Sequence, residues 1–268
     1  MSRTPRNPSS PALRPALWPA VLVGAAWALL ACAPAAWVAD AVASSTRGHV
    51  LLADARGTWH AGSALLVLQG AEHDAELAPG RLRWTLGFAD VWRGRVHLTL
   101  DWPDVAPAPL RLETGLAAGG WTLRQTDAET WAATLPASLL VGLGAPWNTI
   151  APDGALALTM HGLGLRSAQG RLRMHGALQL DARDMRSRLS PVAPLGSWRL
   201  RLEGEGADAA LRLSTLEGPL MVEGTGDWNG SRLQFTGRAH AAPGQEQALA
   251  GLLDLIGQPD GSGVRIAL

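Results

Sequence analysis

Strict alternation of apolar and polar residues is the feature that most limits how this chain can fold. In "RLRWTLGF", residues 81–88, Leu82, Trp84 and Leu86 lie on one side of an extended chain, and the residues between them lie on the other. This period of two is typical of a half-buried β-strand. The same pattern recurs in "RVHLTLDW" (95–102), "RLRMHGALQLD" (171–181), "SWRLRLEGE" (197–205) and "ALRLSTLEG" (210–218).

The spacing of these segments predicts the fold class. Gly and Pro clusters separate them at intervals of about 10 to 20 residues, which is typical of an antiparallel all-β protein. Two later segments, 135–144 and 246–257, have helical spacing instead, and Gly257 ends the second. We therefore predict a mainly β protein, built as an extended antiparallel sheet with two short helices.

The two faces of such a sheet differ, and this difference restricts its shape. A sheet with one apolar face cannot leave that face in water, and two short helices cover too little of it. The sheet must therefore curl, as a half-pipe or a sandwich-like structure, or hold something apolar.

An internal echo accompanies the alternation. "GSALLVL" (62–68) before "GRLRWTL" (80–86) resembles "GALALTM" (154–160) before "GRLRMHG" (170–176). A looser third copy is "GPLMVEG" (218–224) before "GSRLQFTG" (230–237). The repeated unit is a hairpin entered through glycine, which indicates an internal duplication of the β-domain.

A long apolar run near the N-terminus predicts a membrane anchor. Residues 16–39 carry no charge over 24 positions, enough for a transmembrane helix at a rise of about 1.5 Å per residue across a core of about 30 Å. Arg3, Arg6 and Arg14 precede the run and Asp40 follows it, so the short tail stays cytoplasmic. We expect a cytoplasmic tail at 1–15, a transmembrane helix at 16–39 and an exported β-rich domain at 40–268.

Two other interpretations of this run remain open. "LLAC" (29–32) resembles a lipoprotein signal that would be cleaved and acylated at Cys32, and "AVA" (41–43) resembles the cleavage site of a secretory signal. The run continues past Cys32 to Val38 and exceeds the usual length of a signal-peptide core, about 7 to 15 residues. All three interpretations place the bulk of the protein outside the cytoplasm.

Composition excludes some classes of partner. The formal net charge is zero, and all 23 basic residues are Arg. Three of these Arg precede the anchor, which leaves 20 Arg against 23 acidic residues, a net charge of about −3. Nucleic acid requires a clustered basic surface, so we expect no nucleic-acid partner. The single cysteine, Cys32, excludes a disulfide framework.

No catalytic motif emerges from the sequence. It lacks H-E-x-x-H, G-x-S-x-G and the phosphate-binding G-x-x-x-x-G-K. "GTGDWNG" (224–230) lacks the spacing of a dinucleotide-binding loop and joins two predicted strands. "AEHDAE" (71–76) groups three carboxylates and one His, and we interpret it as a solvated loop because nothing else supplies matching metal ligands. We predict no catalytic residues, cofactor, metal or small-molecule substrate.

Several segments together resemble a known family. They are "ADARGTWHAGSALL" (53–66), "PLGSWRLRLEGEG" (194–206), "LRLSTLEGPLMVEGTGDW" (211–228) and "LQFTGRAHAAPGQEQALAGLLDLIG" (233–257). In their order and spacing they resemble the N component of the bacterial type II secretion system, the GspN family. This resemblance implies a single-pass inner-membrane protein with a cytoplasmic N-terminus and a periplasmic bulk. It also implies a non-catalytic accessory role in exporting folded proteins from the periplasm across the outer membrane.

The resemblance implies partners, which are other type II secretion subunits in the inner membrane. The polar face of the hairpin at 218–241 offers Glu223, Arg232 and Arg238 as candidate partner contacts. The alternative is a periplasmic lipid-handling or envelope-maintenance protein with an apolar β-groove. In that case the apolar face of the sheet would stay open and bind lipid.

Overall fold

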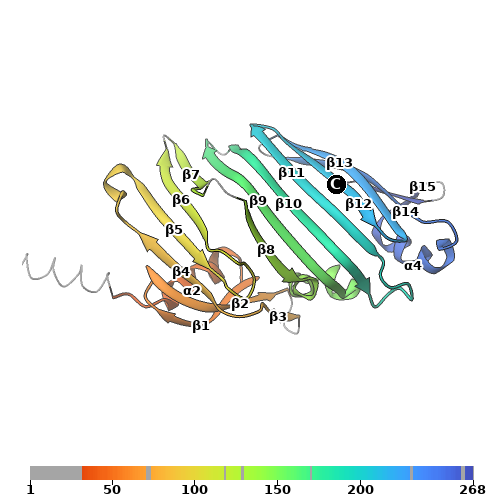
Figure 1. The fold of residues 1–268 in the computed structure, drawn as a ribbon, viewed down its shortest axis with the longest axis horizontal. Coiled ribbons are helices and arrows are strands. Elements are labelled where there is room, and N and C mark those ends of the chain that lie inside the picture. Colours follow the sequence, from red (N-terminus) through yellow and green to blue (C-terminus); the bar gives the residue numbers. More distant parts are fainter. Residues whose placement is uncertain are drawn as a thin grey trace, which may run out of the picture.

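The computed structural model of the chain describes residues 32–70, 74–117, 119–127, 130–169, 171–229, 232–260 and 263–267. Within these residues, the strands form one open antiparallel sheet of 16 strands (Figure 1). The predicted class, mainly β and antiparallel with short helices, is confirmed.

The elements have the following bounds. The strands are β1 (Val50–Gly57), β2 (Ala61–Gln69), β3 (Ala75–Leu77), β4 (Leu82–Gly87), β5 (Arg95–Asp101), β6 (Leu110–Ala117), β7 (Gly120–Gln125), β8 (Trp131–Pro136), β9 (Pro152–Ala168), β10 (Arg171–Ser187), β11 (Gly196–Gly206), β12 (Ala209–Glu217), β13 (Leu220–Trp228), β14 (Leu233–Ala241), β15 (Gln258–Asp260) and β16 (Gly263–Ala267). The helices are α2 (Ala36–Ser45), η1 (Val91–Arg93), η2 (Ala137–Leu143), α3 (Trp147–Ile150) and α4 (Glu246–Ile256), of which η1 and η2 are 3₁₀-helices.

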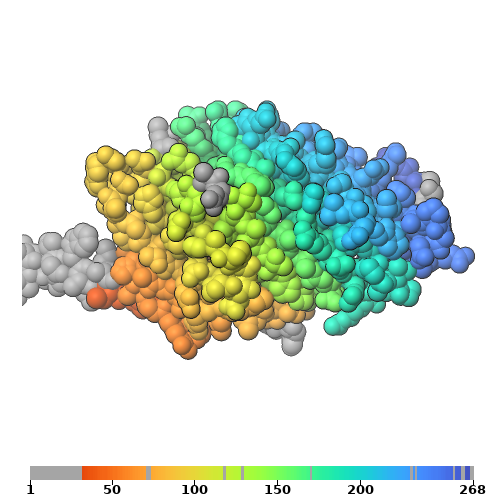
Figure 2. Space-filling view, in the orientation of Figure 1, coloured from red at the N-terminus to blue at the C-terminus, as the bar shows by residue number. Residues whose placement is uncertain are grey.

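The order of strands in the sheet follows the order of the chain almost throughout. The path runs β1-β2-β4-β5-β6-β7-β9-β10-β11-β12-β13-β14-β16-β15, while β3 branches from β2 and β8 from β9. Strand β9 pairs with β8 along its first half and with β7 along its second half. The chain therefore progresses from one end of the molecule to the other, as the colours show in Figure 2.

The register confirms that apolar residues share one face. Leu178 of β10 pairs with Met160 of β9 on one side and with Leu202 of β11 on the other. Farther along, glycines make room on this face for Phe235 of β14, whose side chain is only 7% exposed. A Cβ atom on Gly224 would lie 2.4 Å from the ring of Phe235, so this position requires glycine.

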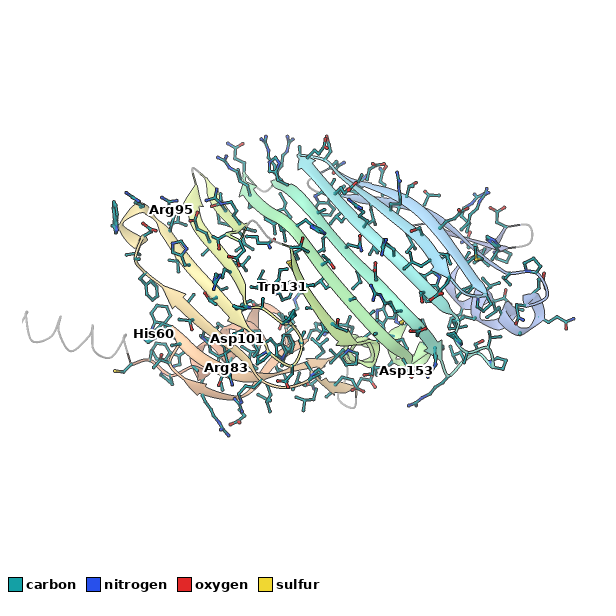
Figure 3. All side chains as sticks on the ribbon, in the orientation of Figure 1. His60, Arg83, Arg95, Asp101, Trp131 and Asp153 are labelled. Atoms are coloured by element: carbon teal, nitrogen blue, oxygen red, sulfur yellow. The ribbon has the colours of Figure 1, made fainter. Side chains whose placement is uncertain are left out.

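The sheet curls at its N-terminal end, as the one-sided pattern predicts. Strands β2 and β3 turn back to contact η2, the helix that follows β8. The approach is close, because a Cβ atom on Gly142 would lie 2.4 Å from the carbonyl oxygen of Leu68. Nearby, the indole Nε1 of Trp131 donates to the carbonyl oxygen of Ala108 at 2.9 Å and ties β8 to the β5–β6 connection (Figure 3).

Helices cover the apolar face at both ends of the sheet. Leu249, Leu252 and Leu253 of α4 are buried against Leu220, Ala239 and Val264 at the C-terminal end. At the other end, Ala35 beside α2 packs with Ala64 and Trp84. Helix α4 confirms the helix predicted at 246–257. The segment 135–144 begins instead as the end of β8 and continues as the 3₁₀-helix η2.

The first described residues pack against the sheet. Residues 32–39, the end of the predicted transmembrane segment, belong to the domain: Ala33 and Ala35 are 3% and 1% exposed, and α2 starts at Ala36. In the part of the chain that the structure describes, no helix is long and apolar enough to cross a membrane. Residues 1–15 and 16–31 of the predicted tail and span lie outside the described residues.

Two candidate binding surfaces on opposite faces of the sheet

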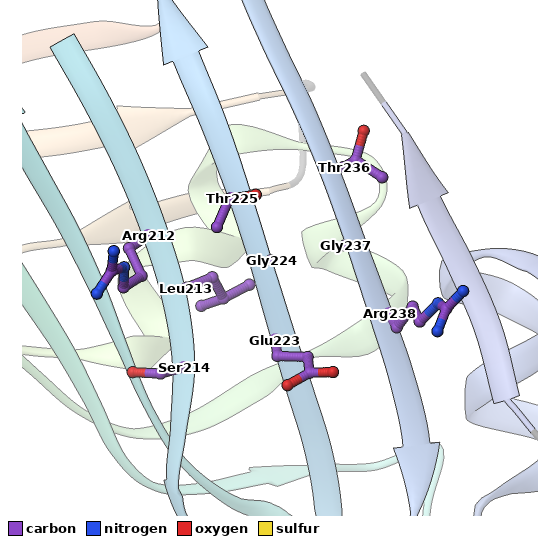
Figure 4. Close-up of a pocket in the computed structure, with 9 residues that line it drawn as sticks. All are labelled: Arg212, Leu213, Ser214, Glu223, Gly224, Thr225, Thr236, Gly237 and Arg238. Carbon is purple, nitrogen blue, oxygen red and sulfur yellow. The ribbon is translucent and has the colours of Figure 1, made fainter.

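The polar face of β12, β13 and β14 carries a shallow trough of about 550 Å³ (Figure 4). Glu223 of β13 and Arg238 of β14 are register partners, and both side chains are exposed. The other polar side chains that line the trough are Arg212, Ser214, Thr225 and Thr236. Two of the three predicted contact residues are therefore neighbours here.

A fork between two strands creates this trough. Strands β12 and β13 pair only from Ala209 to Leu213, although the turn that joins them lies several residues farther on. Beyond Leu213, the hydroxyl of Thr215 accepts a hydrogen bond from the N–H of Val222 at 2.6 Å and donates to its C=O at 2.8 Å. This side chain replaces the missing strand–strand bonds and holds the strands apart.

Charges of both signs continue from the trough toward the edge of the sheet. Asp260 of β15 lies 2.8 Å from the guanidinium of Arg265 and 3.9 Å from that of Arg238. The side chain of Arg238 is 69% exposed. Exposed ion pairs of this kind contribute little to stability, so these groups can exchange partners at small cost. The surface therefore suits a polar protein surface with complementary charges.

Arg232 does not join this group. It closes the turn at the other end of the β13–β14 hairpin, where its backbone N–H donates to Oδ1 of Asn229 at 3.0 Å. Six residues of extended strand, about 20 Å, separate it from Arg238. Arg212 and Asp260 were not predicted, because their proximity to Arg238 depends on a register that a single sequence does not specify.

The apolar face carries a second candidate site, a groove of about 340 Å³ over β9 to β13. Leu180, Leu200 and Leu213 line it and are only half-buried. The other lining residues are Leu140, Trp147, Leu156, Ala182, Met185, Trp198, Leu220 and Val222. The indole Nε1 of Trp198 donates to the carbonyl oxygen of Leu220 at 3.0 Å, which fixes one wall. The groove offers an apolar ligand contact with aliphatic and aromatic carbon.

One ion pair of the polar face, between Asp181 and Arg199, is structural in character. Arg199 donates from Nε and Nη2 to the two carboxylate oxygens of Asp181, at 2.7 and 2.8 Å, and Asp181 is 2% exposed. The hydrogen bonds from Arg199 hold the pKa of Asp181 below its usual range, and Asp181 raises the pKa of Arg199. Both groups stay charged near neutrality, which suits an ion pair and not a proton donor or acceptor.

Of the segment 71–76, which groups three carboxylates with one His, the structure describes only residues 74–76. Asp74 accepts a hydrogen bond from Nδ2 of Asn148 at 2.9 Å, and residues 71–73 lie outside the described residues. Among the residues that are described, no group of three or more His, Cys, Asp or Glu side chains is placed to hold a metal ion. The expectation of no metal or cofactor stays a prediction.

Comparison with known proteins assigns the chain to a family. The family model for the type II secretion system (T2SS), protein N, matches residues 48–267. No curated protein and no solved structure matches the chain. The matched residues extend from just before β1 to the last residue of β16, so they include the whole sheet and both candidate surfaces. The chain belongs to the type II secretion system protein N family.

Proposed function

We propose that the protein is a non-catalytic, inner-membrane accessory subunit of the type II secretion system. In this role it supports the export of folded proteins from the periplasm across the outer membrane. The observation that carries the proposal is the family match over residues 48–267, which includes the whole sheet. The exposed, mixed-charge trough around Glu223 and Arg238 supports a role in binding other proteins.

The proposed topology is a single span upstream of the folded domain, with the N-terminus cytoplasmic and the sheet periplasmic. The packing of α2 favours an uncleaved anchor over a secretory signal. A cut after Ala43 would fall within α2 and remove Ala35, which is 1% exposed in the N-terminal core. A periplasm-active reporter fused after Leu268 should be active, and the purified protein should keep its N-terminus. A mature chain that starts at Ser44, or at an acylated Cys32, would contradict the anchor.

Gene deletion tests the function itself. Deleting the gene should leave export across the inner membrane intact and cause secreted cargo to accumulate in the periplasm. Complementation should be weaker with Arg238→Glu, which reverses the charge at the trough, than with Arg173→Glu, an exposed control on β10. Normal cargo release from the deletion strain would refute the proposed role.

Crosslinking tests the partner. A photo-crosslinker at position 238 should capture another membrane-anchored secretion subunit, because two proteins held in one membrane meet at high effective concentration. The same probe at position 232, about 20 Å away along β14, tests whether the turn of the β13–β14 hairpin is also a contact. A probe at position 173 is the matched control. Capture at 173 as efficient as at 238 would show that the trough is not the contact.

The half-buried leucines of the groove favour lipid handling as a second candidate function. Leu180, Leu200 and Leu213 face a groove lined by apolar side chains, where acyl chains would contact carbon on several sides. A photo-crosslinker at position 200 should then capture phospholipid, and one at position 201 on the polar face should not. Lipid capture combined with normal cargo release would favour this function over the secretion role.

A further inference from the structure

Exposed aromatic side chains gather at the end of the molecule where the described chain begins. Trp37 of α2 is 59% exposed, and Trp92 of η1, in the β4–β5 connection, is 71% exposed. Phe88 and Val91 of the same connection are 37% and 53% exposed. Figure 1 shows α2 and the β4–β5 connection at the end opposite to α4. Large exposed apolar side chains that cluster in this way mark an interaction surface.

A ring contact and a shared recess connect Trp37, Trp59 and Phe88, and Val91 and Trp92 follow Phe88 in the same connection. The rings of Trp59 and Phe88 lie 5.4 Å apart between centroids, and Trp59 also contacts His60, which is labelled at this end in Figure 3. Trp37 and Trp59 line one shallow recess of about 520 Å³, whose other walls are almost entirely apolar. We call Trp37, Trp59, Phe88, Val91 and Trp92 the aromatic end patch.

The N-terminal apolar run leads directly into this patch. The N–H of Trp59 donates to the carbonyl oxygen of Ala33, and the N–H of Ala35 donates to that of Gly57, both at 3.0 Å. The chain is therefore fixed beside Trp59 from Ala33 onward, with no spacer between the patch and residue 31. The uncharged residues 16–31 would span about 24 Å as a helix, less than the hydrocarbon core of about 30 Å. A helix of this length would draw the patch toward the headgroup layer.

We propose that the aromatic end patch lies in the interfacial layer of the bilayer that carries the N-terminal anchor. Indole rings favour this layer because they combine an apolar body with an N–H donor. Arg93, whose guanidinium lies 4.1 Å from the ring centroid of Trp92, adds a cation at the level of the lipid phosphates. The long axis of the sheet then points away from the membrane, with α4 at the distal end. This inference rests on the proposed membrane anchor.

Depth-dependent quenching of a single fluorophore tests the proposal. The full-length protein with Cys32→Ser receives one cysteine by Trp92→Cys, is labelled with an environment-sensitive dye and is reconstituted into phosphatidylethanolamine–phosphatidylglycerol vesicles. The dye should be quenched by lipids brominated near the headgroup and protected from aqueous iodide. The matched control is Leu255→Cys, an apolar position on α4 that is 50% exposed at the distal end. A dye there should be quenched by aqueous iodide and not by the brominated lipids.

Flotation separates failure of this inference from failure of the anchor. If the protein floats with the vesicles but the dye at position 92 is quenched by iodide as at position 255, the patch does not face the bilayer, although the anchor holds. If the protein does not float, the anchor fails and this inference fails with it. A dye placed by Trp37→Cys must behave as at position 92, since both positions belong to one patch.

Discussion

Asp181 illustrates how this sheet holds a charge on its polar face. The carboxylate is 2% exposed and accepts hydrogen bonds from Arg199 and Arg183. Asp181→Asn should lower the free energy of unfolding by about 1.5 to 3 kcal/mol, the usual contribution of hydrogen bonds to a charged group. Urea titration followed by tryptophan fluorescence measures the change. Asp153→Asn is the control, because Asp153 is 73% exposed and lies 4.0 Å from its partner Arg186. Equal losses in both variants would contradict this account.

The lowered pKa of Asp181 also predicts the pH dependence of stability. Arg199 favours the charged carboxylate in the folded state, so near the ordinary Asp pKa of about 3.9 the unfolded chain binds more protons. The stabilisation is therefore complete above about pH 4 and is lost as the pH falls through the folded pKa. The difference in stability between the wild type and Asp181→Asn should be constant near neutrality and shrink in acid. A difference that persists at low pH would show that the ion pair is not its cause.

At the scale of elements, α4 closes the C-terminal end of the sheet through a few leucines. Leu249 is completely buried, whereas Leu255 on the same helix is 50% exposed. Leu249→Ala should cost about 2 to 5 kcal/mol, because it removes buried carbon and leaves a cavity. Leu255→Ala should change stability little. Chemical denaturation of the two variants checks this contrast, and a similar loss in both would mean that α4 does not pack as described.

Whether a position along β14 tolerates a charge should depend on which face of the sheet its side chain lies on. Phe235 is 7% exposed in the glycine-lined recess, and its neighbour Gln234 is exposed on the polar face. Phe235→Asp should abolish folding, since an unpaired buried charge costs several kcal/mol, of the order of the total stability. Gln234→Asp should fold normally by circular dichroism. Leu178→Asp should be intermediate, because Leu178 is only half-buried. Equal tolerance at 234 and 235 would refute a one-sided sheet.

The elements differ in how well the sequence predicted them. Strands such as β4 and β10 were predictable because apolar and polar residues alternate along a strand that is buried on one face. Helix α4 was predictable because its leucines keep helical spacing. Helix α2 was not, because its first residues continue an apolar run whose composition also suits a membrane span. Segment 135–144 has helical spacing, but its backbone turns too tightly for an α-helix, and composition does not separate these two geometries.

At the scale of the whole molecule, the two ends of the sheet have separate cores. Within the described residues, the cluster around Leu249 and the cluster around Trp84 share no member. Leu249→Ala should therefore speed amide hydrogen exchange in α4 and β13 to β16 and leave β4 and β5 unchanged, because each end opens as its own unit. Exchange followed by mass spectrometry checks this pattern. Uniform acceleration over the chain would indicate a single cooperative core.

The candidate sites depend on how several strands pair across the whole sheet. The sequence therefore predicted them only in part. The face on which Glu223, Arg232 and Arg238 lie follows from alternation within each strand. Their grouping follows from register and from the fork at Thr215, which are properties of paired strands. The internal echo falls on neighbouring strands of the sheet, β2 with β4, β9 with β10 and β13 with β14. The internal duplication itself stays a prediction.

Because the strands follow one another in the sheet nearly in chain order, the number of strands sets the length of the sheet. Each strand on the path from β1 to β15 adds about 4.8 Å, so the path measures about 60 Å along the sheet. A hairpin inserted between β7 and the trough would leave the N-terminal end of the sheet and its packing unchanged. The charged residues around Arg238 would move outward by about 10 Å, the width of two strands. Duplication of hairpins, of which the sequence keeps an echo, is therefore a direct way to set the distance between the N-terminal end of the sheet and the trough.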